Sequence, residues 1–171
     1  EGQHIDCALF DSQIAMLANQ SANWLNAEFC PTRMGNNHPS VVPYAVYKAS
    51  DGFVIVACGN DKQFIRLTAA LGVPKLAYKA DFMSNETRIE NRDELDKELS
   101  KAIALFDRET VISMLEDAGV SCGPINDISE VFDDEHVQAR GTRVDQYRSD
   151  SSLISSTAFP AKLSKTPAQY H

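Results

Sequence analysis

The sequence has 171 residues, of which 43% are hydrophobic and 23% are charged, and its net charge is −8. This composition is typical of a globular domain and excludes disordered, collagenous and disulfide-scaffold proteins. Acidic residues cluster, with 11 acidic against 5 basic over 81–118. Because nucleic acids and anionic membrane surfaces would be repelled, we expect neither among the partners.

The cysteines stand far apart, at positions 7, 30, 58 and 122, and form no C-x-x-C pair. The four histidines also lack the spacing of metal ligands. We therefore expect buried cysteines that act as small hydrophobic residues, no metal site, and a reduced, cytoplasmic protein.

The first residues contain neither an initiator Met nor a signal segment, so we expect the chain to begin within a longer protein. Apolar residues at helical spacing predict one helix over 8–28, with Trp24 in the core and Asp6 or Asp11 as its cap. Pro31 would end it.

After a proline-rich loop over 31–43, two β-branched and aromatic runs at 44–48 and 53–58 flank Asp51-Gly52 and predict a hairpin. A helix capped by Asn60 or Asp61 should follow and end near Gly72.

Two further helices are expected before Gly119, the first capped by Asn91 and the second by Asp107. A short strand or loop at 120–128 precedes an acidic helix over 129–140, and possible strands follow at 143–147 and 153–159. The predicted fold class is α+β. A small domain with a hairpin or small antiparallel sheet, covered by helices, is flanked by an N-terminal connecting helix and a C-terminal segment.

The candidate site is the loop that precedes the hairpin. It combines a cation, two amides, an imidazole and a conformationally free glycine, which together suit a carboxylate or carbonyl oxygen. The alternative is ordinary turn chemistry, with the imidazole bonded to a nearby carbonyl. The candidate substrate-binding residues are Arg33, Gly35, Asn36, Asn37, His38 and Pro39.

An ordered set of short matches along the whole chain resembles the middle of a class III coenzyme A transferase (CaiB/BaiF) family member. This group includes formyl-CoA transferase, the carnitine and bile-acid CoA transferases and alpha-methylacyl-CoA racemase. The matches are Gly2-Gln3-His4-Ile5-Asp6, Leu9-Phe10-Asp11-Ser12, Arg33-Met34-Gly35-Asn36, His38-Pro39, Pro43-Tyr44, Asp51-Gly52, Gln63-Phe64, Leu71-Gly72, Asn91-Arg92, Gly119-Val120, Gly123-Pro124, His136 and Arg140-Gly141.

The resemblance implies a parent about twice as long, with a large Rossmann-like domain and a small central domain. Residues 1–30 would then be the connecting helix from the large domain, 31–140 the small domain, and 141–171 the start of the return. Family members interlock as dimers, so a homodimer is expected.

The resemblance also implies a mechanism in which an Asp carboxylate attacks an acyl-CoA thioester. Neither Asp6 nor Asp11 matches the motif of that Asp, which would lie before residue 1, so no catalytic residue is expected in this chain. Coenzyme A thioesters would be substrates, and no cofactor would be bound permanently.

The loop at 35–39 corresponds to the family's loop that shields reactive intermediates from water. Formyl-CoA transferase has a glycine-rich run there, whereas this sequence has Asn-Asn-His-Pro. The pattern over 33–44 is more similar to members that act on dicarboxylic acids such as succinate or glutarate. This likeness suggests that Arg33 or His38 pairs with a distal carboxylate.

Two alternatives stay open. One is a racemase of the same family that moves a proton next to the thioester carbonyl. The other is a non-catalytic module in which the loop holds a small acid.

Overall fold

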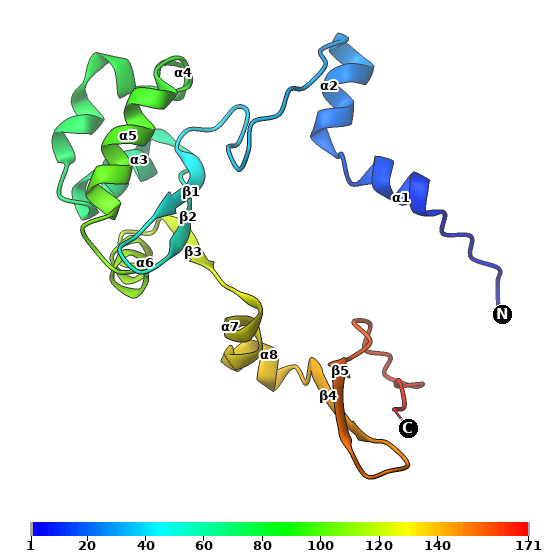
Figure 1. The fold of residues 1–171 in the computed structure, drawn as a ribbon. Coiled ribbons are helices and arrows are strands. Elements are labelled where there is room, and N and C mark those ends of the chain that lie inside the picture. Colours follow the sequence, from blue (N-terminus) through cyan, green and yellow to red (C-terminus); the bar gives the residue numbers. More distant parts are fainter. Residues whose placement is uncertain (1, 171) are drawn as a thin grey trace. The chain divides into compact units, whose positions relative to one another are not determined.

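The computed structural model describes residues 2–170 (Figure 1). The α-helices are α1 (Leu9–Ala15), α2 (Asn19–Ala27), α3 (Asp61–Ala70), α4 (Asn85–Glu90), α5 (Arg92–Ile103), α6 (Arg108–Asp117), α7 (Ile128–Asp133) and α8 (Glu135–Ala139). The strands are β1 (Tyr44–Lys48), β2 (Phe53–Ala57), β3 (Ser121–Ile125), β4 (Arg143–Tyr147) and β5 (Leu153–Thr157), and two 3₁₀ helices are η1 (Pro74–Tyr78) and η2 (Ala80–Phe82).

Internal packing divides the chain after Pro39 into two compact units. All buried residues of the described part lie in the second unit, between Val42 and Val120. Over residues 2–170, no helix has both the length and the apolar character needed to cross a membrane. The predicted assignment of 1–30, 31–140 and 141–171 to parts of a longer protein stays a prediction.

The main sheet has three antiparallel strands in the order β1-β2-β3. Lys48 lies opposite Phe53, and the Ala49 N–H donates to the Gly52 carbonyl at 2.9 Å, which closes the turn. The hairpin predicted from Asp51-Gly52 is therefore confirmed. Strand β3 adds to the other edge of β2, with Gly123 opposite Ile55.

Helices α3, α5 and α6 pack with this sheet to form the core, because each presents an apolar stripe. Alternate residues of β2, Val54 and Val56, are fully buried, as are Phe64, Leu99 and Leu115 of the three helices. The expected α+β fold, with a small antiparallel sheet and helices that cover it, is confirmed. The predicted strands at 143–147 and 153–159 form a separate two-stranded sheet, β4-β5.

Side-chain caps begin several helices of this unit. The Asn60 side chain accepts from the Gln63 N–H at 3.0 Å, and Asp107 accepts from Thr110 at 2.8 Å, as predicted. The predicted cap at Asn91 is wrong, because its side-chain amide instead donates back to the Thr87 carbonyl at 2.9 Å.

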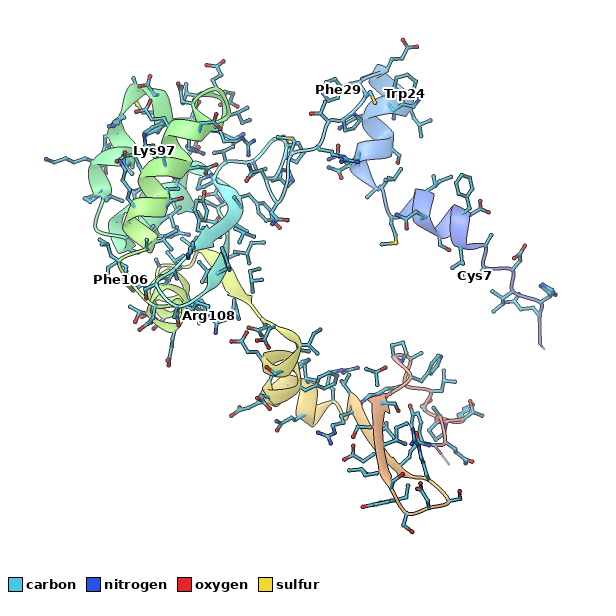
Figure 2. The ribbon with its side chains drawn as sticks, in the orientation of Figure 1. Cys7, Trp24, Phe29, Lys97, Phe106 and Arg108 are labelled. Carbon is cyan, nitrogen blue, oxygen red and sulfur yellow. The ribbon has the colours of Figure 1, made fainter. Side chains whose placement is uncertain are left out.

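The single helix predicted over 8–28 is two helices. Leu17 and Ala18 bond to carbonyls three residues earlier, and Ala18 has a φ of 47°, so the chain turns between α1 and α2. Ala8 stands at the first N-cap with no side-chain hydrogen bond, so neither Asp6 nor Asp11 caps the helix. Trp24 is 55% exposed rather than in the core (Figure 2).

The acidic helix predicted over 129–140 is also divided, into α7 and α8. Asp134 adopts an extended conformation and accepts from the Val137 N–H at 3.0 Å, so its carboxylate begins a second helix.

The expectation of buried cysteines holds for Cys58 but is wrong for Cys7 and Cys30, which are exposed; all four thiols are free.

Candidate functional site

The predicted site loop makes a turn within the first compact unit. The Asn37 N–H donates to the Met34 carbonyl at 3.3 Å, and Gly35 has a φ of 62°. A Cβ at Gly35 would meet no atom within 4 Å. The left-handed backbone, rather than lack of space, therefore favours glycine here.

This loop and α2 enclose a pocket of about 530 Å³ that lies wholly within the first unit. Amide and hydroxyl groups alternate with apolar surface around it, and none of the lining residues is charged. The lining consists of Gln20, Asn23, Phe29, Pro31, Thr32, Met34, Gly35, Asn37 and Pro39.

The structure brings Gly35, Asn37 and Pro39 of the predicted set into this lining. Arg33 and Asn36 stand exposed on the loop beside it, and His38 is half-buried. A binding role for the six residues stays a prediction. Sequence reasoning missed Gln20 and Asn23, because the break between α1 and α2 gives no signal in the apolar spacing.

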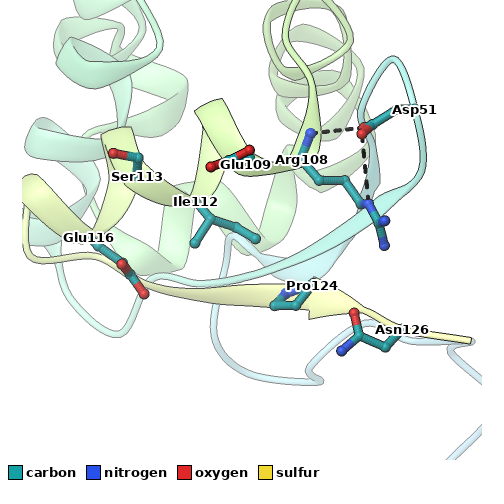
Figure 3. A pocket seen from close by; sticks show the side chains of 8 residues that line it. All are labelled: Asp51, Arg108, Glu109, Ile112, Ser113, Glu116, Pro124 and Asn126. Carbon is teal, nitrogen blue, oxygen red and sulfur yellow. Dashed lines mark hydrogen bonds and ion pairs between the residues drawn. The ribbon is translucent and has the colours of Figure 1, made fainter. Parts of the chain in front are cut away.

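A second pocket, of about 440 Å³, lies in the second unit beside the start of α6 (Figure 3). Its cation is Arg108, whose backbone N–H donates to Asp51 Oδ1 at 2.8 Å and whose guanidinium forms an ion pair with Glu130. The hydrogen bond to Glu130 raises the pKa of Arg108.

This second pocket is poorly suited to an anionic substrate. Asp51, Glu109 and Glu116 line it together with Arg108, and two carboxylates already neutralise that arginine. A carboxylic acid or a coenzyme A phosphate would therefore be repelled. The uncharged pocket beside residues 33–39 is therefore the better candidate for binding an anionic substrate.

Two residues that sequence reasoning missed fix the backbone directly after the loop. The Asn85 side chain accepts from the Val42 N–H at 3.1 Å and donates to the Ser40 carbonyl at 2.9 Å. Arg88 Nε donates to the Val42 carbonyl at 2.7 Å. The Ser84-x-x-Thr87 capping box at the start of α4 is the signal that could have placed them.

The Cys58 thiol is fully buried and is not available as a nucleophile. Burial raises the pKa of the Cys58 thiol to about 11, which keeps it protonated at neutral pH. Within residues 2–170, no cluster of three His, Cys, Asp or Glu side chains can hold a metal ion.

Comparison with known proteins shows to which family the chain belongs. The model of CoA-transferase family III matches residues 1–171. The chain belongs to CoA-transferase family III. The resemblance expected from the short ordered matches is thus confirmed.

Curated members of the family align over nearly all of the chain. It is 41% identical to the succinate–glutarate CoA-transferase of Agrobacterium fabrum, over 99% of this chain and 42% of that protein. It is 34% identical to the succinyl-CoA:mesaconate CoA-transferase of Haloarcula hispanica, over 97% of this chain and 41% of that protein. The chain thus spans about two fifths of the length of these relatives.

Solved structures agree with the fold. A CAIB/BAIF family protein from Brucella suis superposes with a TM-score of 0.81 at 38% identity, over 98% of this chain and 43% of that chain. Rv3272 from Mycobacterium tuberculosis has a TM-score of 0.77 at 20% identity, over 97% of this chain and 43% of that chain, and shows the shared fold alone.

Proposed function

We propose that the whole protein transfers coenzyme A between dicarboxylic acids such as succinate and glutarate. The observation that carries this proposal is the 41% identity, over 170 residues, to a succinate–glutarate CoA-transferase. The human succinyl-CoA:glutarate CoA-transferase, 36% identical over 82% of this chain, supports the same class of acid.

The proposed chemistry uses an Asp carboxylate outside this chain. The carboxylate attacks the thioester carbonyl and expels the coenzyme A thiolate, which leaves a mixed anhydride. The thiolate then attacks the aspartyl carbonyl and releases the donor acid. The acceptor carboxylate attacks the aspartyl carbonyl of the resulting thioester and expels the thiolate, which leaves a second mixed anhydride. The thiolate then attacks the acceptor carbonyl of that anhydride, which forms the new acyl-CoA and releases the Asp carboxylate.

In this proposal residues 35–39 of the loop limit the access of water to the anhydride. Arg33 or His38 pairs with the distal carboxylate of the acid. The position of Arg33 beside an uncharged pocket supports this assignment, because Arg33 is the sole arginine or lysine of the unit that ends at Pro39.

The test compares Arg33→Ala and His38→Ala with wild type in the full-length enzyme, using acids of equal length. If Arg33 binds the distal carboxylate, Arg33→Ala raises KM for glutarate by about tenfold or more, the effect of losing a charge-assisted hydrogen bond. KM for pentanoate, which has no second carboxylate, should stay unchanged. Unchanged KM for glutarate in both variants would contradict the role of the loop.

The proposal extends to a homodimer in the cytoplasm, supported by the family likeness and by the four free thiols. Light scattering on the full-length protein tests the dimer. The racemase alternative receives no support from the relatives described above, which are transferases by name.

A further inference from the structure

Asn85 makes an unusual pair of long-range contacts. Its single side-chain amide bonds two backbone groups 45 and 43 residues away, the Ser40 carbonyl at 2.9 Å and the Val42 N–H at 3.1 Å. Both groups belong to the stretch that directly follows Pro39. The amide therefore fixes the point from which the loop at 33–39 departs.

The two hydrogen bonds of Asn85 to Ser40 and Val42 form a clamp, and the residues around Asn85 are themselves held by hydrogen bonds. Asn85 is the first residue of α4, where Ser84 and Thr87 form a capping box. One turn later, the fully buried Arg88 holds the Val42 carbonyl at 2.7 Å. Arg88 is itself fixed by hydrogen bonds to the Phe82 carbonyl at 3.0 Å and to Asp61 at 2.7 Å.

We infer that Asn85 is a positioning residue for the loop at 33–39. The inference rests on the proposed function, in which that loop keeps water from the reactive anhydride. Loss of the clamp would let water attack the anhydride carbonyl. The products would then be the free acid, the free thiol of coenzyme A and the restored Asp carboxylate, in place of a new acyl-CoA.

Asn91 offers a matched control. Its side-chain amide also donates to backbone carbonyls, but to those of Thr87 in α4 at 2.9 Å and Asp81 in η2 at 3.4 Å rather than to residues 40–42. Asn85→Ala and Asn91→Ala therefore remove similar groups from neighbouring positions. Only Asn85→Ala should disturb the loop.

The experiment uses both variants in the full-length enzyme with two readouts. The first is the share of consumed acyl-CoA that is hydrolysed rather than transferred. The second is the rate of tryptic cleavage after Arg33, which is exposed on the loop. Both should rise severalfold in Asn85→Ala and stay at the wild-type level in Asn91→Ala, with each variant measured at a temperature at which it is fully folded.

Asn85→Asp adds a variant that keeps an acceptor for the Val42 N–H but loses the donor to Ser40. It should give intermediate values of both readouts, even if Asn85→Ala folds poorly. If tryptic cleavage fails to distinguish the Asn85 variants from Asn91→Ala, Asn85 does not position the loop. If cleavage rises in Asn85→Ala but hydrolysis does not, the loop does not keep water from the anhydride. A wild-type enzyme without transfer would contradict the proposed function instead, and the cleavage rates would still decide whether Asn85 holds the loop.

Discussion

The first compact unit and the stretch 42–120 carry similar apolar patterns but bury them very differently. No described residue up to Pro39 is buried, and Trp24 and Leu25 of α2 are 55% and 77% exposed. In contrast, Leu95 and Leu99 of α5 are fully buried. Helical spacing of apolar residues thus predicts a helix in both regions, but it does not predict where the packing partner lies.

The largest expected effect comes from the same substitution in the two regions. Leu99→Ala should lower the free energy of unfolding of the 171-residue chain by about 3 kcal/mol, because it leaves a cavity in a closed core. Leu25→Ala should change it by less than about 0.5 kcal/mol. Urea unfolding followed by circular dichroism measures both. Equal losses would refute the contrast between the regions.

The next effect concerns the buried guanidinium. Arg88→Lys keeps the charge but cannot reproduce hydrogen bonds to Val42, Phe82 and Asp61 at once. We expect Arg88→Lys to lower the free energy of unfolding, measured in urea, by about 2 kcal/mol. The control Arg143→Lys, on an arginine whose side chain is 57% exposed, should leave the unfolding midpoint unchanged.

A smaller effect distinguishes the helix ends. Asn60→Ala removes the side-chain acceptor that begins α3 and should lower the free energy of unfolding by about 1 kcal/mol. In α2, Asn26 bonds the Ala22 carbonyl within its own helix. Asn26→Ala should therefore be neutral or slightly favourable, since alanine is the better helix former. Thermal unfolding of both variants measures these changes. If Asn26→Ala lowers the free energy of unfolding as much as Asn60→Ala does, the Asn60 side chain has no special effect as a helix cap.

The smallest effect lies outside the core, at α7. The hydrogen bond from Arg108, followed by that from the Asp127 N–H, holds the pKa of Glu130 below its usual value. Ionised Glu130 therefore stabilises α7 fully above about pH 4.3, and this contribution is lost as pH falls through the lower folded pKa. Hydrogen exchange of residues 128–133 should be slower in wild type than in Glu130→Gln at about pH 6, where Glu130 is ionised.

As pH falls, this difference between wild type and Glu130→Gln should disappear. A difference that persists at low pH would show that the charge of Glu130 is not its cause. Residues 92–103 of α5, whose apolar face is buried, serve as the internal reference and should exchange alike in both proteins.

The elements that the sequence predicts well are those specified by local chemistry. Asp51-Gly52 fixes the hairpin turn, and Asn60 and Asp107 begin their helices through contacts only three residues away. Helix α4 gives no apolar spacing in the sequence, because Ile89 is the one apolar residue over 84–92. The 3₁₀ helices before it were missed as well. Arg88 reads as a surface residue there, and only the folded chain brings its three acceptors together.

One part of the candidate site could likewise be predicted from the local sequence, and another part could not. The turn at Gly35 follows from glycine and amide residues next to one another, and its positive φ confirms that reading. The other wall of the pocket comes from Gln20 and Asn23, whose position depends on the turn between α1 and α2. The clamp by Asn85 depends on contacts across more than 40 residues, which no local pattern encodes.

Strand β3 has a consequence for solubility. It is an edge strand of the main sheet, it is only five residues long, and it contains Gly123 followed by Pro124. Proline has no N–H to offer to another strand, and glycine has no side chain to pack against one. This edge is therefore a weak template for the addition of a foreign strand, which protects this side of the sheet from edge-to-edge aggregation.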